Sequence, residues 1–283
     1  MSKRAERKAR KSAAQPSRAG RVWWWRSALI AVGLALTAGL MLGARRLEEQ
    51  VHSEIALRQR PQFHLSGAPP GLDERISDQL NAMDELIWID PQLCRRICDV
   101  LAGNAWVKRV RSVRKTSVPN VEISCDYRTP AAMVEGRGDF YLVDADRVRL
   151  PGHYGHHPSL LVIRGVAGSP PAAGEVWTAP ELTAGLAMIK SLEAEPYRKQ
   201  IMGVVLRNYR GREDRRAPQI ELMTDRPDGR IIWGSAPGEE VEENSAAQKL
   251  SILRANFASK GRADAGLRAI DISTLPGRYT TPG

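Results

Sequence analysis

The spacing of hydrophobic residues along the chain predicts its elements. The first signal is an uncharged run over residues 27–44, which as a helix rising ~1.5 Å per residue would span roughly 27 Å, close to the thickness of a bilayer core. Aromatic and basic side chains, which favour the membrane interface, flank this run: Trp23, Trp24, Trp25, Arg26, Arg45 and Arg46. The pattern predicts one transmembrane helix in contact with membrane lipids.

The distribution of charge predicts the orientation of this helix. Nine of the 42 Lys and Arg side chains, but one of the 32 Asp and Glu side chains, lie in residues 1–26. The positive-inside rule places such a tail in the cytoplasm. A cleaved signal peptide is the alternative, but the run ends in Gly-Ala-Arg-Arg, which favours an uncleaved anchor. The remaining charges nearly balance, which disfavours nucleic-acid binding by the exported part.

Helical and strand spacings alternate beyond a charged, helix-prone stalk at residues 45–60. Strands are expected at residues 62–66, 107–114 and 121–127, where apolar and polar residues alternate. Helical spacing is seen first in Leu72, Ile76, Leu80 and Met83, and then in Leu93, Ile97, Val100 and Leu101. Asp90 is the expected N-cap of the second helix, with Pro91 at its first position. Residues 61–130 therefore predict the order strand, helix, helix, strand, strand.

Residues 131–283 predict a second, β-rich domain. Its strands are expected at residues 131–134, 140–143, 160–163, 204–207, 219–223, 230–233 and 267–272. Two helices are marked by Leu182, Leu186, Ile189 and Leu192, and by Ala247, Leu250, Leu253 and Phe257. Because consecutive strands joined by short turns pair antiparallel, we expect an α+β domain whose sheet is mostly antiparallel.

One histidine-rich loop is the main candidate for chemistry. His153, His156 and His157 follow Asp144 and Asp146, and imidazoles with carboxylates can ligate zinc. The loop lacks the spacing that places two ligands on one helical face, so a polar surface loop is the favoured interpretation.

The other reactive residues also favour structural roles. Three cysteines are too few for a disulfide framework, and Cys94 and Cys98 fit the apolar stripe of a predicted helix. Acidic pairs such as Glu242-Glu243 are expected in a solvated loop. With no nucleophile beside an evident base, the sequence predicts neither an enzyme nor a metal, cofactor or small-molecule substrate.

Short motifs add a family resemblance to this pattern. Trp106-Val107 opens the second predicted strand, Pro119 precedes the third, and Arg128-Thr129-Pro130 closes it. In this order of elements they resemble the POTRA domain and the adjoining β domain of the FtsQ/DivIB family of bacterial cell-division proteins. Later segments also resemble that family: Tyr141-Leu142-Val143-Asp144, Leu161 to Gly165, Ile232-Trp233-Gly234, Lys249-Leu250 and Ala269-Ile270-Asp271. The family's Asp-x-x-Gly turn reads Asp144-Ala145-Asp146-Arg147 here, and the last strand is short and polar.

The resemblance implies a non-catalytic scaffold of the divisome, anchored in the cytoplasmic (inner) membrane with its domains outside, that links division proteins during septum formation. It also implies partners that are small single-pass proteins with coiled-coil segments, one of which adds a strand to the C-terminal sheet edge. The residues implied at that edge are Arg268, Ile270, Ile272 and Tyr279. The alternative is a membrane-anchored envelope enzyme or ligand-binding protein that uses His153, His156 and His157.

Overall fold

The computed structural model describes residues 33, 37–46, 59–83, 86–136 and 138–274. Residues 37–46 are helical and exposed, and Arg45 and Arg46 are the last of them. Residues 23–26, most of the predicted membrane run and most of the stalk lie outside the described residues. Within the described ranges, no helix has the length and apolar character that a membrane crossing requires.

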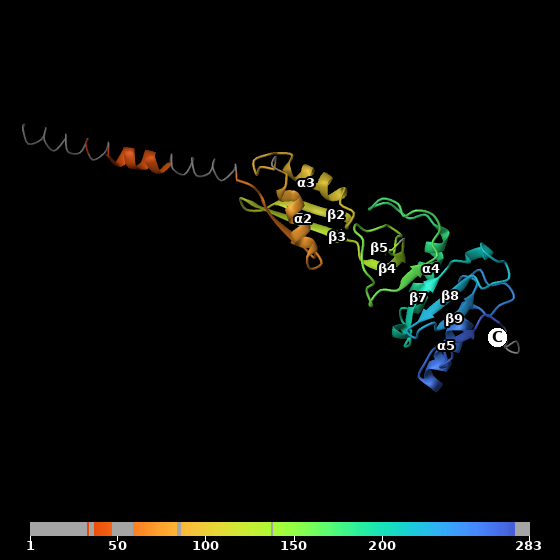
Figure 1. The fold of residues 1–283 in the computed structure, drawn as a ribbon. Helices are drawn as coiled ribbons and strands as arrows, with labels where there is room; N and C mark the ends of the chain where they lie inside the picture. The colour runs from red at the N-terminus through yellow and green to blue at the C-terminus, as the bar shows by residue number, and fades with distance from the viewer. Residues whose placement is uncertain (1–32, 34–36, 47–58, 84–85, 137, 275–283) are drawn as a thin grey trace, which may run out of the picture.

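A first module, residues 59–127, combines two helices with a three-stranded mixed sheet. Its elements are β1 (Gln62–Ser66), α2 (Leu72–Asn81), α3 (Leu93–Ala102), β2 (Val107–Lys115) and β3 (Asn120–Tyr127), which confirms the predicted order. Strand β3 is central, parallel to β1 and antiparallel to β2 (Figure 1). The helices bury the stripes that their spacing predicted, and these share one core with β3: Leu72, Ile76, Leu80, Leu93, Ile97, Leu101, Val121 and Ile123.

The start of α3 differs from the prediction. The helix begins at Leu93 with Gln92 as its N-cap, so Pro91 is not its first residue. Asp90 instead closes a turn before the helix: its Oδ1 accepts a 2.8 Å hydrogen bond from the Gln92 amide, and its carbonyl accepts one from the Leu93 amide. The prediction of Asp90 as the N-cap of α3 is therefore wrong, because Asp90 and Pro91 lie in a turn that precedes the helix.

A second module, residues 130–274, is built on one seven-stranded sheet in the order β10-β9-β8-β7-β6-β4-β5. The strands are β4 (Pro130–Glu135), β5 (Phe140–Asp144), β6 (Val162–Arg164), β7 (Ile201–Val205), β8 (Ile220–Thr224), β9 (Arg230–Gly234) and β10 (Ala269–Asp271), and the helices are α4 (Pro180–Leu192) and α5 (Ala246–Lys260). The α+β class and the two helices are confirmed.

The expected mostly antiparallel sheet is wrong, because the sheet is mixed. Strand β6 is parallel to both β4 and β7, and β10 is parallel to β9. The cause is the length of the connections: α4 lies between β6 and β7, and α5 between β9 and β10, and such crossovers bring the chain back in the same direction. Strand pairs joined by short turns, such as β8 and β9, are antiparallel as predicted.

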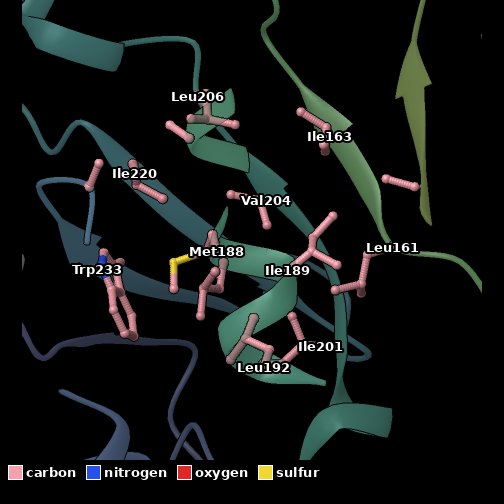
Figure 2. Close-up of a cluster of buried hydrophobic side chains, with 14 of the residues drawn as sticks. Leu161, Ile163, Met188, Ile189, Leu192, Ile201, Val204, Leu206, Ile220 and Trp233 are labelled. Carbon is pink, nitrogen blue, oxygen red and sulfur yellow. The ribbon is translucent and has the colours of Figure 1, made fainter. Parts of the chain in front are cut away.

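The two faces of this sheet have different covers. Both helices contribute to the core on one face. There Met188, Ile189 and Leu192 of α4 lie against Ile201 and Val204 of β7 (Figure 2). On the opposite face Met133, Leu142, Leu150 and Val162 form a smaller core, against which Trp106 of the first module packs.

The joint between the modules is held by polar bonds as well as by Trp106. The Nη1 of Arg128 donates to the Oδ2 of Asp144 at 2.6 Å, and Asp144 is only 3% exposed. The other oxygen of Asp144 accepts hydrogen bonds from the amides of Asp146 and Val148, which shapes the turn after β5. Where the resembling family has Gly in this turn, Arg147 adopts a left-handed backbone with φ of 67°.

Candidate functional site

Strand β10 is one edge of the seven-stranded sheet. The carbonyl of Arg268 accepts a hydrogen bond from the amide of Arg230, and the amide of Ile272 donates to the carbonyl of Ile232. In a parallel ladder alternate residues bond to one neighbour, so the backbone groups of Ala269 and Asp271 face away from β9. Among the described elements none pairs with this outer side.

The opposite edge of the sheet, β5, is closed by the chain itself. The loop after β5 returns along it, and isolated bridges join Phe140 to Tyr154 and Val143 to Arg149. Two hydrogen bonds link the backbones of Phe140 and Tyr154, at 3.1 and 3.0 Å. Of the two edges of this sheet, the described residues therefore leave β10 open and cover β5.

The structure places the predicted edge residues in different environments. Ile272 is 2% exposed and belongs to the main core, and Ile270 packs against the same core while remaining half-buried. Arg268 has a side chain that is 78% exposed, and its Nη2 lies 3.0 Å from the Oδ2 of Asp228. Tyr279 lies outside the described residues. The two isoleucines thus fix β10 to the module, and the backbone groups of Ala269 and Asp271 face outward.

Asn244 holds the C-terminal end of this edge, which the sequence did not indicate. This side chain is 2% exposed, and its Nδ2 donates to the carbonyls of Ile272 and Thr274 at 3.0 and 2.5 Å. Its own amide donates to the carbonyl of Ser273 at 2.8 Å. Because Asn244 satisfies three consecutive carbonyls, it fixes the backbone of residues 272–274 at the end of β10.

A buried charge pair, Lys249 and Glu243, lies next to Asn244. Lys249 is fully buried, and its Nζ donates to the Oε2 of Glu243 at 2.8 Å and lies 5.3 Å from the centre of the Trp233 ring. The Glu243 carboxylate also accepts bonds from the amide and hydroxyl of Ser235, both at 3.0 Å. Glu242 is exposed as expected, but the prediction of a solvated Glu243 is wrong, since three donors draw it towards the module.

The histidines of the alternative hypothesis do not converge. His153 Nδ1 lies 3.5 Å from the Oδ2 of Asp139, and both side chains are exposed. The ring of His156 contacts Phe140 edge-on, and His157 Nδ1 lies 2.7 Å from the Ser159 hydroxyl.

Neither these histidines nor the cysteines form a metal site in the described part of the chain, where no three His, Cys, Asp or Glu side chains come together in a way that could hold a metal ion. Cys94 and Cys98 are half-buried and Cys125 is buried, all as free thiols. Burial raises the pKa of the Cys98 and Cys125 thiols, so at neutral pH they are protonated and weakly nucleophilic.

The described geometry thus offers an open backbone edge, held by the packing of Ile270 and Ile272 and by the hydrogen bonds of Asn244. Such an arrangement can accept an extended segment through main-chain hydrogen bonds. Comparison with models of known protein families gives no match, and a search of curated proteins finds no similar sequence.

Proposed function

We propose that this protein is a non-catalytic scaffold of bacterial cell division, anchored by residues 27–44, whose β10 edge receives an extended segment of a partner. The observation that carries the proposal is the contrast between the two edges of the seven-stranded sheet. The protein covers β5 with its own loop, whereas β10 has no neighbour among the described elements on its outer side. An edge with unpaired N–H and C=O groups is a template for strand addition.

The proposed role in cell division rests on the motif resemblance to the FtsQ/DivIB family. The order of elements in the first module agrees with the POTRA-like order from which the resemblance was drawn. The expected partner is a small single-pass division protein with a coiled-coil segment. The short length of β10 limits the ladder to a few hydrogen bonds, so we expect side chains to add to the affinity, and the resemblance implies Tyr279 as one of them.

The test uses the outward-facing position Ala269. Proline there removes an amide that points away from β9 and is tolerated at a sheet edge, whereas serine keeps the amide and serves as the matched control. The full-length chain, fused to a fluorescent protein, should concentrate at division septa, and partners recovered from membranes should be lost with Ala269→Pro and kept with Ala269→Ser.

Two results would count against different parts of the proposal. A uniform distribution of the wild-type fusion over the envelope would exclude the role in division. Equal recovery of partners by Ala269→Pro and wild type would exclude the β10 edge as the binding site. Deletion of residues 276–283, which removes Tyr279, is expected to abolish recovery of the partner without changing membrane insertion or the folding of the exported part.

A further inference from the structure

A hollow of about 330 Å³ lies at the joint of the two modules, at the opposite end of the sheet from β10. Its walls are formed by the start of α2, by Trp106 and residues 128–130 at the joint, and by Tyr154 from the loop that covers β5. The joint lies between β2 and β3 on one side and β4 and β5 on the other (Figure 1). The volume is at the small end of the ~300–1,000 Å³ typical of ligand sites, which suits one large side chain and its backbone.

The walls of this hollow are apolar and preformed. Pro69, Pro70 and Pro130 contribute rigid rings, and Trp106 is fixed by its contacts with the cores of both modules. Tyr154 is fixed by the 2.6 Å hydrogen bond that its hydroxyl donates to the carbonyl of Pro151. A surface built from ordered aromatic and proline rings loses little conformational freedom when it binds a ligand.

The charge around the hollow has one sign. Two arginines line it and no carboxylate does. Arg128 is already paired with Asp144, whereas Arg75 is exposed and makes no ion pair with another described residue. The acidic side chains of α2, Asp73, Glu74 and Asp78, line a different hollow beside β1. The charge left uncompensated at the joint is therefore positive.

We propose that this joint hollow is a second docking site, which binds a segment of a partner polypeptide with an aliphatic or proline side chain next to an Asp or Glu. The apolar side chain would contact Trp106 and Tyr154, and the carboxylate would pair with Arg75. Charge complementarity disfavours residues 1–26 and 275–283 as occupants, because the first range is strongly basic and the second contains no Asp or Glu side chain. This site is separate from the β10 edge and does not depend on the proposed function.

The test is a selection on the full-length chain with a random heptapeptide library. Enriched peptides should place Asp or Glu beside an aliphatic residue or Pro. Their affinity should fall about tenfold with Arg75→Glu, as expected for loss of one charge-assisted bond and its replacement by repulsion. Thr129→Trp, which fills the hollow from an exposed position, should also abolish binding. Arg95→Glu is the matched control, since Arg95 is an exposed arginine of α3 outside the hollow.

Several outcomes would overturn the proposal. These are the absence of any enriched peptide, enrichment without acidic residues, or equal binding to wild type, Arg75→Glu and Thr129→Trp. A synthetic peptide of residues 47–58, which contain acidic and aliphatic side chains, is included as a competitor. If it outcompetes every selected peptide, the occupant is a second copy of this chain and the assignment to a partner is wrong.

Discussion

Glu243→Gln is predicted to destabilise the second module more than Lys249→Met does, although each variant removes the same ion pair. The difference follows from what each change leaves behind. Lys249 is fully buried, so without the carboxylate its ammonium group keeps only the Trp233 ring and a neutral amide oxygen as neighbours. The Glu243 side chain is 23% exposed and keeps two hydrogen bonds from Ser235 when the lysine is lost.

These contacts set the expected magnitudes. Removing one member of a buried ion pair costs about 3–5 kcal/mol, and the lower end applies to Glu243→Gln because the new amide oxygen can still accept from Lys249. For Lys249→Met we expect a loss of about 1 kcal/mol, since methionine fills the space beside Trp233 and the carboxylate of Glu243 keeps its two hydrogen bonds from Ser235. The double variant removes both charges and should lie within about 1 kcal/mol of wild type.

Hydrogen exchange of the β9 amides measures the loss of stability next to the Lys249–Glu243 pair, because Trp233 of β9 contacts Lys249. The free energy of opening for residues 231–233 reports on the second module alone, which avoids treating a chain with two modules as a two-state system. Amides of β1 and β3 provide the internal control and should exchange at wild-type rates in all variants. Equal losses in the two single variants, or a double variant with the sum of both losses, would refute this account of the buried pair.

Three further predictions concern other sites. Ile97→Ala should cost about 2–5 kcal/mol, because Ile97 is fully buried between the helices and sheet of the first module, and an unchanged melting temperature would contradict this. Arg147→Gly should raise stability by up to about 1 kcal/mol, because glycine adopts the left-handed backbone at this position without the cost that arginine incurs. That cost exceeds the contribution of the exposed 3.2 Å hydrogen bond from Arg147 to Thr183, which the variant loses. A lower melting temperature would disprove this. Burial raises the pKa of the Asp264 carboxyl, but hydrogen bonds from Arg262 and a backbone amide outweigh it and hold the pKa below its ordinary value of 3.8. The stability from this group is thus present above pH 3.8 and lost as the pH falls through the lowered pKa, so Asp264→Asn should be less stable at pH 7 and flatten the acid side of the stability curve.

The helices and most strands could be predicted from local pattern, whereas the sheet pairing could not. Strand β7 illustrates the limit: it begins at Ile201 rather than at the predicted residue 204, because Gly203 gives no apolar signal. Glycine is required there, since a Cβ atom would collide with the carbonyl of Val162 on β6. A parallel neighbour thus explains this glycine, and nothing in the local sequence identifies that neighbour.

The same limit applies to the candidate site. Alternation predicted a strand at β10 and the inward position of Ile272, because a buried face leaves a period of two in the sequence. It could not predict that Asn244 holds the end of this strand, since a buried polar contact between a loop and a distant strand has no periodic signature. The joint hollow was missed for a related reason: residues 69–72, 75, 106, 128–130 and 154 meet only in the folded chain.

The parallel pairing of β1 with β3 has a mechanical consequence. The chain enters the first module at the N-terminal end of β1 and leaves it for the second module at the C-terminal end of β3. When the chain is pulled from both sides, these two parallel strands are drawn in opposite directions along their length. The force is then shared by all the hydrogen bonds between residues 62–66 and 120–124 at once, instead of opening them one after another. For the membrane-anchored scaffold proposed above, this arrangement of the strands is the one that would best resist tension.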